Sequence, residues 1–122
     1  MRRFILFCGW VLLSACGVPP NSESGFPGVE GARLFKAKGC VTCHTIGEGV
    51  KVGPDLRGLF ARRDEAWVRR YISDPGAMFE SDPTAKALKE KYKVAMPKMM
   101  ISASEMDQLI AYLQKATAAS NP

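Results

Sequence analysis

The residues with the most distinctive chemistry stand together in the run Cys40-Val41-Thr42-Cys43-His44. The run contains the only histidine of the chain and two of its four cysteines. Its C-x-x-C-H pattern is typical of c-type haem attachment, in which both thiols bond to the vinyl groups of the haem. The adjacent imidazole is then placed as the proximal iron ligand. The sequence therefore predicts one covalently bound haem c, attached at Cys40 and Cys43, with His44 on the iron.

Two other chemistries use cysteines at this spacing. A thioredoxin-like dithiol is expected within a βαβ unit, and no strand pattern flanks residues 40–44. A zinc site needs a fourth protein ligand, and no other His or Cys is free nearby. Haem attachment is therefore the interpretation that the local sequence favours.

The N-terminus has the pattern of an export signal. Arg2 and Arg3 form a short basic region, and residues 4–13 are apolar. Such a stretch is typical of a signal peptide and is too short to span the roughly 30 Å hydrocarbon core of a bilayer. Residues 13–16 (LSAC) resemble the lipobox of bacterial lipoproteins. The resemblance implies that residues 1–15 are a lipoprotein signal peptide and that Cys16 is lipidated. An ordinary signal peptide, with Cys16 as an incidental thiol, is the alternative.

This processing would account for all four cysteines. Cys8 is removed with the leader, Cys16 carries lipid, and Cys40 and Cys43 carry haem, so none remains for a disulfide. Residues 16–28 are rich in Pro, Gly and Ser, and we expect them to form a flexible tether. These features predict a lipid-anchored location in the cell envelope, on the periplasmic or outer-surface side of a bacterial membrane.

Length and charge limit the number of domains and the classes of partner. The 122 residues, less a leader, are enough for one small domain. The net charge of +5 falls further when the basic leader is removed, and it is too weak to indicate a nucleic-acid partner. A local concentration of positive charge is formed by Arg62, Arg63, Arg69 and Arg70. This cluster is either a solvated face or a surface that attracts an acidic redox partner.

Helical patterns follow the tether. We expect a short helix at residues 31–38, ended by Gly39 as its C-terminal cap. A second helix is expected at residues 64–73, because its apolar side chains share one face. The turn at residues 74–76 (DPG) ends it.

Two further helices have clear start signals. Asp82 followed by Pro83 is an N-cap with proline at the first helical position, and it opens a helix through about Tyr92. The last helix begins at a capping box formed by Ser102 and Glu105. No segment alternates as a strand, so the predicted fold class is all-α.

Taken in order, these pieces resemble a class I cytochrome c over residues 29–116. The resemblance is carried by the haem motif together with Phe35, Gly53-Pro54-Asp55-Leu56, Met96-Pro97 and Leu109-Ile110-Ala111-Tyr112-Leu113. It implies a cytochrome c domain at residues 29–117 and a disordered tail at residues 118–122. In that fold the first and last helices pack crosswise around the covalent haem, with one or two extra short helices here between residues 57 and 95. The crossing would bring Gly31 and Phe35 against Leu109 and Tyr112.

The resemblance also addresses the second axial ligand. A thioether sulfur suits low-spin haem iron and raises its reduction potential. Five methionines follow the motif. In small bacterial members the ligand precedes a proline and lies at a set distance before the aromatic residue of the last helix, which Met96 and Tyr112 match. Met99, followed by Met100, is the alternative, and Met106 is expected in the core.

Three further residues would lie beside the haem. The resemblance gives the Pro54 carbonyl a hydrogen bond from the Nδ1–H of His44, which fixes the ring plane. An ordinary Gly-Pro turn is the alternative. Leu56 would pack on the haem face. Trp67 would either donate its indole N–H to a propionate or be a half-buried core residue.

The predicted function is that of a membrane-anchored monohaem cytochrome that transfers single electrons between redox partner proteins. With His44 and Met96 on the iron, no position is left for a small-molecule substrate, so we expect an electron carrier and not an enzyme. One alternative is a cytochrome subunit of a larger reductase or oxidase, docked through residues 57–95. The other is a haem enzyme or gas sensor with a labile sixth ligand, for which no second histidine is available.

Overall fold

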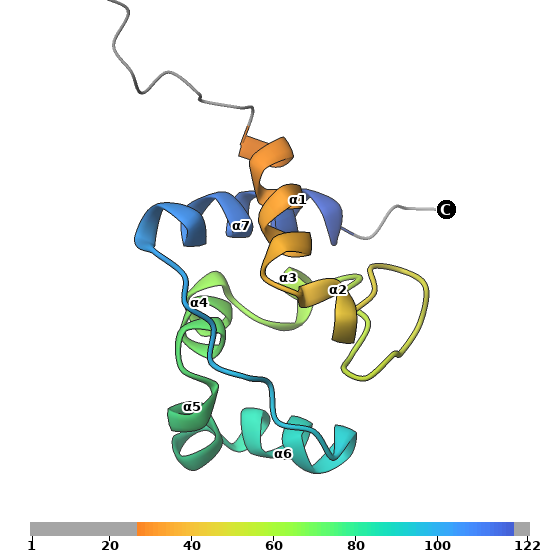
Figure 1. Cartoon of the computed structure of the whole chain (residues 1–122). Coiled ribbons are helices and arrows are strands. Elements are labelled where there is room, and N and C mark those ends of the chain that lie inside the picture. Colours follow the sequence, from red (N-terminus) through yellow and green to blue (C-terminus); the bar gives the residue numbers. More distant parts are fainter. Residues whose placement is uncertain (1–26, 119–122) are drawn as a thin grey trace, which may run out of the picture.

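The computed structural model describes residues 27–118, and within them it contains helices and no strand. This confirms the all-α fold class (Figure 1). The helices are α1 (Pro27–Ala37), α2 (Cys40–Cys43), α3 (Leu59–Arg62), α4 (Glu65–Ser73), α5 (Pro75–Ser81), α6 (Pro83–Tyr92) and α7 (Ala103–Ala116). The expected signal peptide, Cys16, and most of the expected tether and C-terminal tail lie outside the described residues.

Helix α1 begins earlier than the sequence pattern indicated. It starts at Pro27, four residues before the expected helix and two residues inside the segment 16–28 assigned to the tether. Proline suits the first helical position, because its fixed φ is already helical and its missing N–H is not needed there. The helix ends at Ala37, one residue before the expected end, and Gly39 then has φ 78°, a left-handed conformation that glycine adopts without strain.

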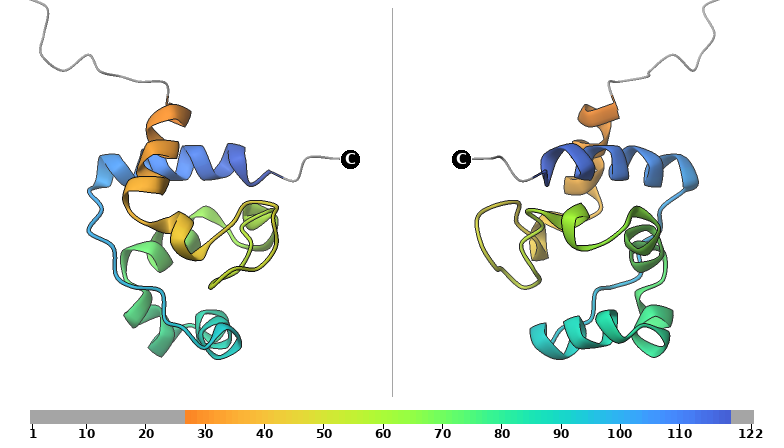
Figure 2. Two further views of the ribbon diagram at one scale, coloured as in Figure 1. Left: turned by 45° about the vertical axis from the view of Figure 1, so that its right-hand side comes forward. Right: turned by 180° about the vertical axis from the view of Figure 1, so that it is seen from behind.

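Helices α1 and α7 cross, and the figures show the crossing from three directions (Figures 1 and 2). A Cβ atom on Gly31 would overlap both the backbone carbonyl oxygen of Gln108 and the Cβ atom of Tyr112. The rings of Phe35 and Tyr112 have their centroids 5.7 Å apart at an angle of 50°. The close approach therefore depends on glycine at the crossing point and on an aromatic pair beside it, as expected.

The main core lies between these two helices and α4. Its buried residues are Phe35, Val68, Ile72, Met106, Leu109, Ile110 and Leu113. Met106 is thus a core residue, as expected. A smaller cluster of Met78, Phe79 and Ala85 packs α5 and α6 together and against Trp67 and Tyr71. Burial of these apolar side chains is the main stabilising contribution to so small a domain.

Helix α5 was missed by the sequence analysis. Asp74 does end α4, but its side chain also accepts a hydrogen bond from the Ala77 N–H (3.1 Å) and so caps α5. Pro75 is the first residue of the new helix. Asp82 and Pro83 start α6 in the same way. The Asp-Pro pair at residues 74 and 75 is therefore a start signal as well as a stop signal.

Candidate functional site

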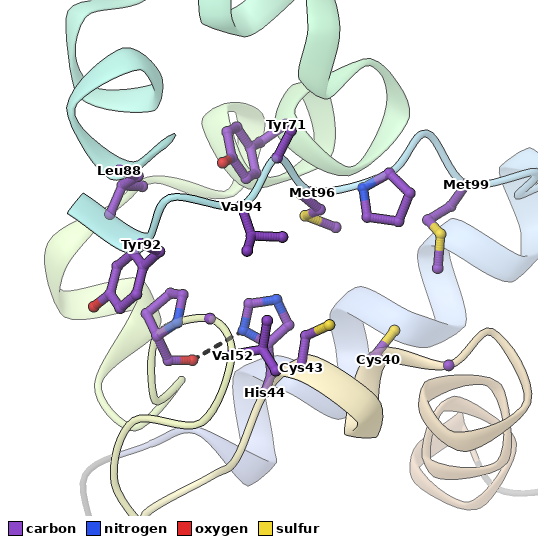
Figure 3. A pocket seen from close by; sticks show the side chains of 15 residues that line it. Cys40, Cys43, His44, Val52, Tyr71, Leu88, Tyr92, Val94, Met96 and Met99 are labelled. Atoms are coloured by element: carbon purple, nitrogen blue, oxygen red, sulfur yellow. Dashed lines mark hydrogen bonds between the residues drawn. The ribbon is translucent and has the colours of Figure 1, made fainter. Parts of the chain in front are cut away.

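The C-x-x-C-H run folds as one helical turn, α2, that ends at His44. The His44 N–H donates to the Cys40 carbonyl (2.9 Å) and the Thr42 N–H donates to the Gly39 carbonyl (3.0 Å). A spacing of three residues on a helix places Cys40 and Cys43 on the same side. Figure 3 shows both sulfur atoms and the His44 ring pointing into one cavity.

The cavity consists of two adjoining hollows of about 690 and 670 Å³, volumes that include space open to solvent. Both are lined by Cys40, His44, Pro54, Tyr71, Leu88, Met96 and Met99. Helix α2 forms one wall, and the segment leading from α6 to α7 forms the opposite wall (Figure 3). Most of the other lining side chains are apolar, so the protein offers a slot suited to a large, flat, mainly apolar group.

His44 is held in one orientation by its neighbours. Its Nδ1 atom lies 2.9 Å from the carbonyl oxygen of Pro54. A carbonyl can only accept, so Nδ1 carries the ring proton and Nε2 keeps a free lone pair for a metal. Gly53 lies against the ring, since a Cβ atom there would be 2.8 Å from Cε1 of His44. The Gly53-Pro54 turn therefore provides the acceptor that the resemblance implied, and Gly53 also leaves space for the ring, which was not predicted.

Two methionines reach the cavity from the opposite wall. Met96 lines both hollows, and so does Met99. Met78 and Met106 are buried in the two clusters, and Met100 is 86% exposed. Of the methionines at residues 78–106, the structure therefore leaves Met96 and Met99 as the candidate sulfur ligands on the wall opposite α2 (Figure 3).

Leu56 and Trp67 both line the second hollow. The Leu56 N–H donates to the Thr45 carbonyl (2.9 Å), which holds its loop against the cavity. The indole N–H of Trp67 donates to the carboxylate of Asp82 (3.0 Å), so it is already used and is not free for a propionate. Asp82 can accept this bond because one of its carboxylate oxygens caps α6 and the other accepts the indole N–H. Trp67 thus matches the alternative, a half-buried residue.

The cavity is also lined by three residues that were not predicted from the sequence, Tyr71, Leu88 and Tyr92. The Tyr71 ring stacks on Trp67 with centroids 4.9 Å apart. Burial raises the pKa of its hydroxyl. Tyr71 follows Trp67 by one helical turn, and residues at this spacing lie on the same face of a helix. The spacing therefore indicated that Tyr71 lies beside Trp67.

The Cys40 thiol lies in a partly buried position. Burial raises the pKa of the Cys40 thiol above its ordinary value. Redox-active pairs need the opposite shift, because the thiolate is the nucleophile. The shift at Cys40 is therefore opposite to the one that a thioredoxin-like dithiol needs.

Asp55 organises the loop that carries Pro54. Its carboxylate accepts hydrogen bonds from the N–H groups of Arg57 (2.8 Å), Gly47 (2.8 Å) and Gly49 (2.6 Å). These bonds, led by that of Arg57, lower the pKa of Asp55 from 3.8 to about 2. The charged carboxylate therefore stabilises the folded loop.

A pH dependence of stability follows from this shift. The contribution of Asp55 is complete above its ordinary pKa of 3.8 and is lost as the pH falls through the folded value of about 2. Asp55→Asn is expected to be less stable than the wild type at pH 6 and to lose less stability between pH 4 and pH 2.5. Urea unfolding midpoints at these pH values measure both effects. Equal pH dependence in the two proteins would contradict this role of Asp55.

Comparison with known proteins identifies the family of the chain. The family model for cytochrome c matches residues 28–117. The chain belongs to the cytochrome c family. Membership implies one covalently attached haem c, and the residues described fit it: two thiols and an imidazole nitrogen face a slot with methionine sulfur on the opposite wall.

Individual relatives cover different shares of the chain. Cytochrome c2 of Blastochloris viridis is 30% identical, with 97% of this chain and 96% of that protein aligned. Cytochrome c of Theileria parva is 34% identical over 82% of this chain and 91% of its own length. With cytochrome c of Cochliobolus lunatus the identity is 56%, but the alignment spans only 32% of that protein.

Solved structures show the same fold. A cytochrome c from Rhodothermus marinus superposes with a TM-score of 0.70 at 25% identity, covering 75% of this chain and 77% of that one. The cytochrome c domain of the pp3183 protein from Pseudomonas putida gives a TM-score of 0.62 at 36% identity, with 71% and 87% covered. Among residues 27–118, no helix combines the length and apolar character needed to cross a bilayer.

Proposed function

We propose that this protein is a single-electron carrier whose haem iron is ligated by His44 and Met96. The observation that supports the proposal most directly is that His44 and Met96 line opposite walls of one cavity. Nε2 of His44 is left free for metal by the 2.9 Å bond between Nδ1 and Pro54, and Met96 lines the cavity from the other side. A bound haem supplies an iron centre that accepts and releases one electron.

The protein groups have distinct tasks in this proposal. Cys40 and Cys43 hold the cofactor by thioether bonds. Pro54 keeps His44 in one tautomer and one ring plane, which limits rearrangement when the charge on the site changes. The apolar lining excludes water and favours the less charged, reduced state. No side chain is required to act as an acid, base or nucleophile.

Carbon monoxide tests this closed site against the alternative of an enzyme or gas sensor. We expect the reduced protein to bind carbon monoxide slowly and weakly, because the Met96 sulfur must first be displaced. Absorption spectra recorded during a titration of the dithionite-reduced protein measure this. Rapid, tight binding would contradict the electron-carrier proposal and support a labile sixth position.

We further propose that the carrier meets redox partners of acidic surface at the mouth of the cavity. Val52 and Val94 line the mouth and are 41% and 51% exposed. The exposed lysines Lys51 and Lys93 precede them directly in the chain, and exposed Lys91 lies two residues before Lys93. The arginine cluster is less suitable, because Arg69 is paired with Glu65 and Asp107 (both 2.7 Å).

The dependence of the reduction rate on ionic strength tests this docking surface. Reduction of the ferric protein by ferrocyanide, a small anionic donor, is expected to slow severalfold as salt rises from low to physiological concentration, since exposed charges are screened. Replacing Lys91 with glutamate should lower the low-salt rate further. Lys115→Glu, on α7, is the matched control and should have less effect. A rate independent of salt would contradict the proposal.

The location in the cell envelope, with a lipid on Cys16, is also proposed. The basis is the LSAC run at residues 13–16, which lies outside the described residues. Membrane fractionation tests it, because Cys16→Ser should move the haem protein from the membrane to the soluble fraction. Recovery with a stoichiometric partner protein would instead favour the complex-subunit alternative.

A further inference from the structure

The segment that carries Met96 has little support of its own. Residues 94–101 connect α6 to α7 without regular structure. Within the part of the chain that the structure describes, no backbone-to-backbone hydrogen bond anchors these residues. Methionine ligation nevertheless requires the Met96 sulfur to stay at a fixed place in the cavity. Side chains from outside the segment must therefore hold it.

One side chain is well placed to do so. Lys38, which follows α1, donates from Nζ to the carbonyl oxygen of Met100 (2.7 Å). The same ammonium pairs with the Glu105 carboxylate of α7 (2.9 Å). The side chain of Lys38 is only 25% exposed, so these charge-assisted bonds are partly protected from water.

Glu105 fixes the direction of the lysine. Its second carboxylate oxygen accepts the N–H of Ser102 (2.8 Å) as part of the capping box of α7. The carboxylate is therefore held in place before it meets Lys38. The other lysine contact on this segment, Lys98 with Asp74 (2.9 Å), has side chains 64% and 47% exposed. Exposed pairs of this kind contribute little.

We propose that Lys38 is a positioning residue for the sixth ligand, because it ties the segment bearing Met96 to the end of α1. Only Gly39 separates Lys38 from Cys40, the first haem attachment residue. Lys38 thus joins the wall that holds the cofactor to the wall that supplies the sulfur. The inference rests on the proposed function in one respect, the assignment of Met96 as ligand.

Competition by imidazole measures how firmly the sulfur is held. Imidazole binds ferric haem iron only when the methionine has left. Lys38→Met is expected to increase the apparent imidazole affinity of the ferric protein about tenfold, the effect of losing one charge-assisted hydrogen bond. Lys38→Arg keeps the charge and donors and should restore most of the wild-type affinity. Lys36→Met, an equal charge change at an exposed position of α1, should leave it unchanged.

A second variant separates positioning from general stability. Glu105→Gln weakens the ion pair and the cap but leaves the bond from Lys38 to Met100. It should lower the unfolding midpoint while changing the imidazole affinity less than Lys38→Met. If Lys38→Met folds poorly, Lys38→Gln should give an intermediate increase in affinity.

The outcomes are distinguishable. Unchanged imidazole affinity in Lys38→Met and Lys38→Gln, or a rise in Lys36→Met equal to that in Lys38→Met, would overturn the positioning role while the ligand assignment stands. Absence of the sulfur-to-iron absorption band from the wild-type ferric protein would overturn the ligand assignment and the positioning role together.

Discussion

Replacing Gly31 with leucine is expected to destabilise the holoprotein by about 3 kcal/mol or more, a large share of the stability of a small domain. A Cβ atom at this position would overlap the carbonyl oxygen of Gln108 and the Cβ atom of Tyr112. Neither can rotate away, because one is backbone and the other is fixed to it. Helices α1 and α7 would have to separate, and the contact between Phe35 and Tyr112 would open.

Urea unfolding followed by circular dichroism measures this effect. Gly28→Leu is the matched control, since it lies on the same helix and a Cβ atom there meets nothing within 4 Å. Both variants gain similar helix propensity. The control should therefore keep a midpoint near that of the wild type. Equal midpoints for the two variants would show that the crossing does not depend on glycine.

Replacing Met96 with alanine is expected to lower the reduction potential by on the order of 0.1 V or more. Axial ligands set haem potentials over a range of about 0.8 V. Ligation by one methionine and one histidine gives potentials at the high end of that range. Without the sulfur, water can reach the iron, and an oxygen ligand favours the ferric state. The lower potential reflects this relative stabilisation of the oxidised form.

A spectroelectrochemical titration gives the potential directly. Met99→Ala removes a neighbouring sulfur from the same wall and is the control. It should shift the potential much less, because Met99 then acts only as a packing residue. A larger shift in Met99→Ala than in Met96→Ala would reassign the ligand to Met99.

Local sequence signals predicted the parts of the site that are local in the chain. Cys40, Cys43 and His44 are neighbours, and one helical turn directs all three into the cavity. The capping box of Ser102 and Glu105 and the Asp82 cap were equally readable, because each depends on residues a few positions apart. The crossing of α1 and α7 followed from the resemblance.

Other parts depend on contacts that no local pattern specifies. The indole of Trp67 donates to Asp82, fifteen residues away, and that choice depends on how α6 packs against α4. The bond from Lys38 to Met100 spans 62 positions. Helix α5 had a local signal in Asp74 and Pro75, but Asp74 also ends α4, and the pattern alone does not distinguish a stop from a stop followed by a new start.

The most direct test of the account is the absorption spectrum of the ferric protein in the region of the weak, long-wavelength sulfur-to-iron band. The spectrum is compared among the wild type, Met96→Ala and Met99→Ala. We predict that the band is present in the wild type and in Met99→Ala and absent from Met96→Ala. A band that persists in Met96→Ala, or that is missing from the wild type, would contradict ligation of the iron by His44 and Met96.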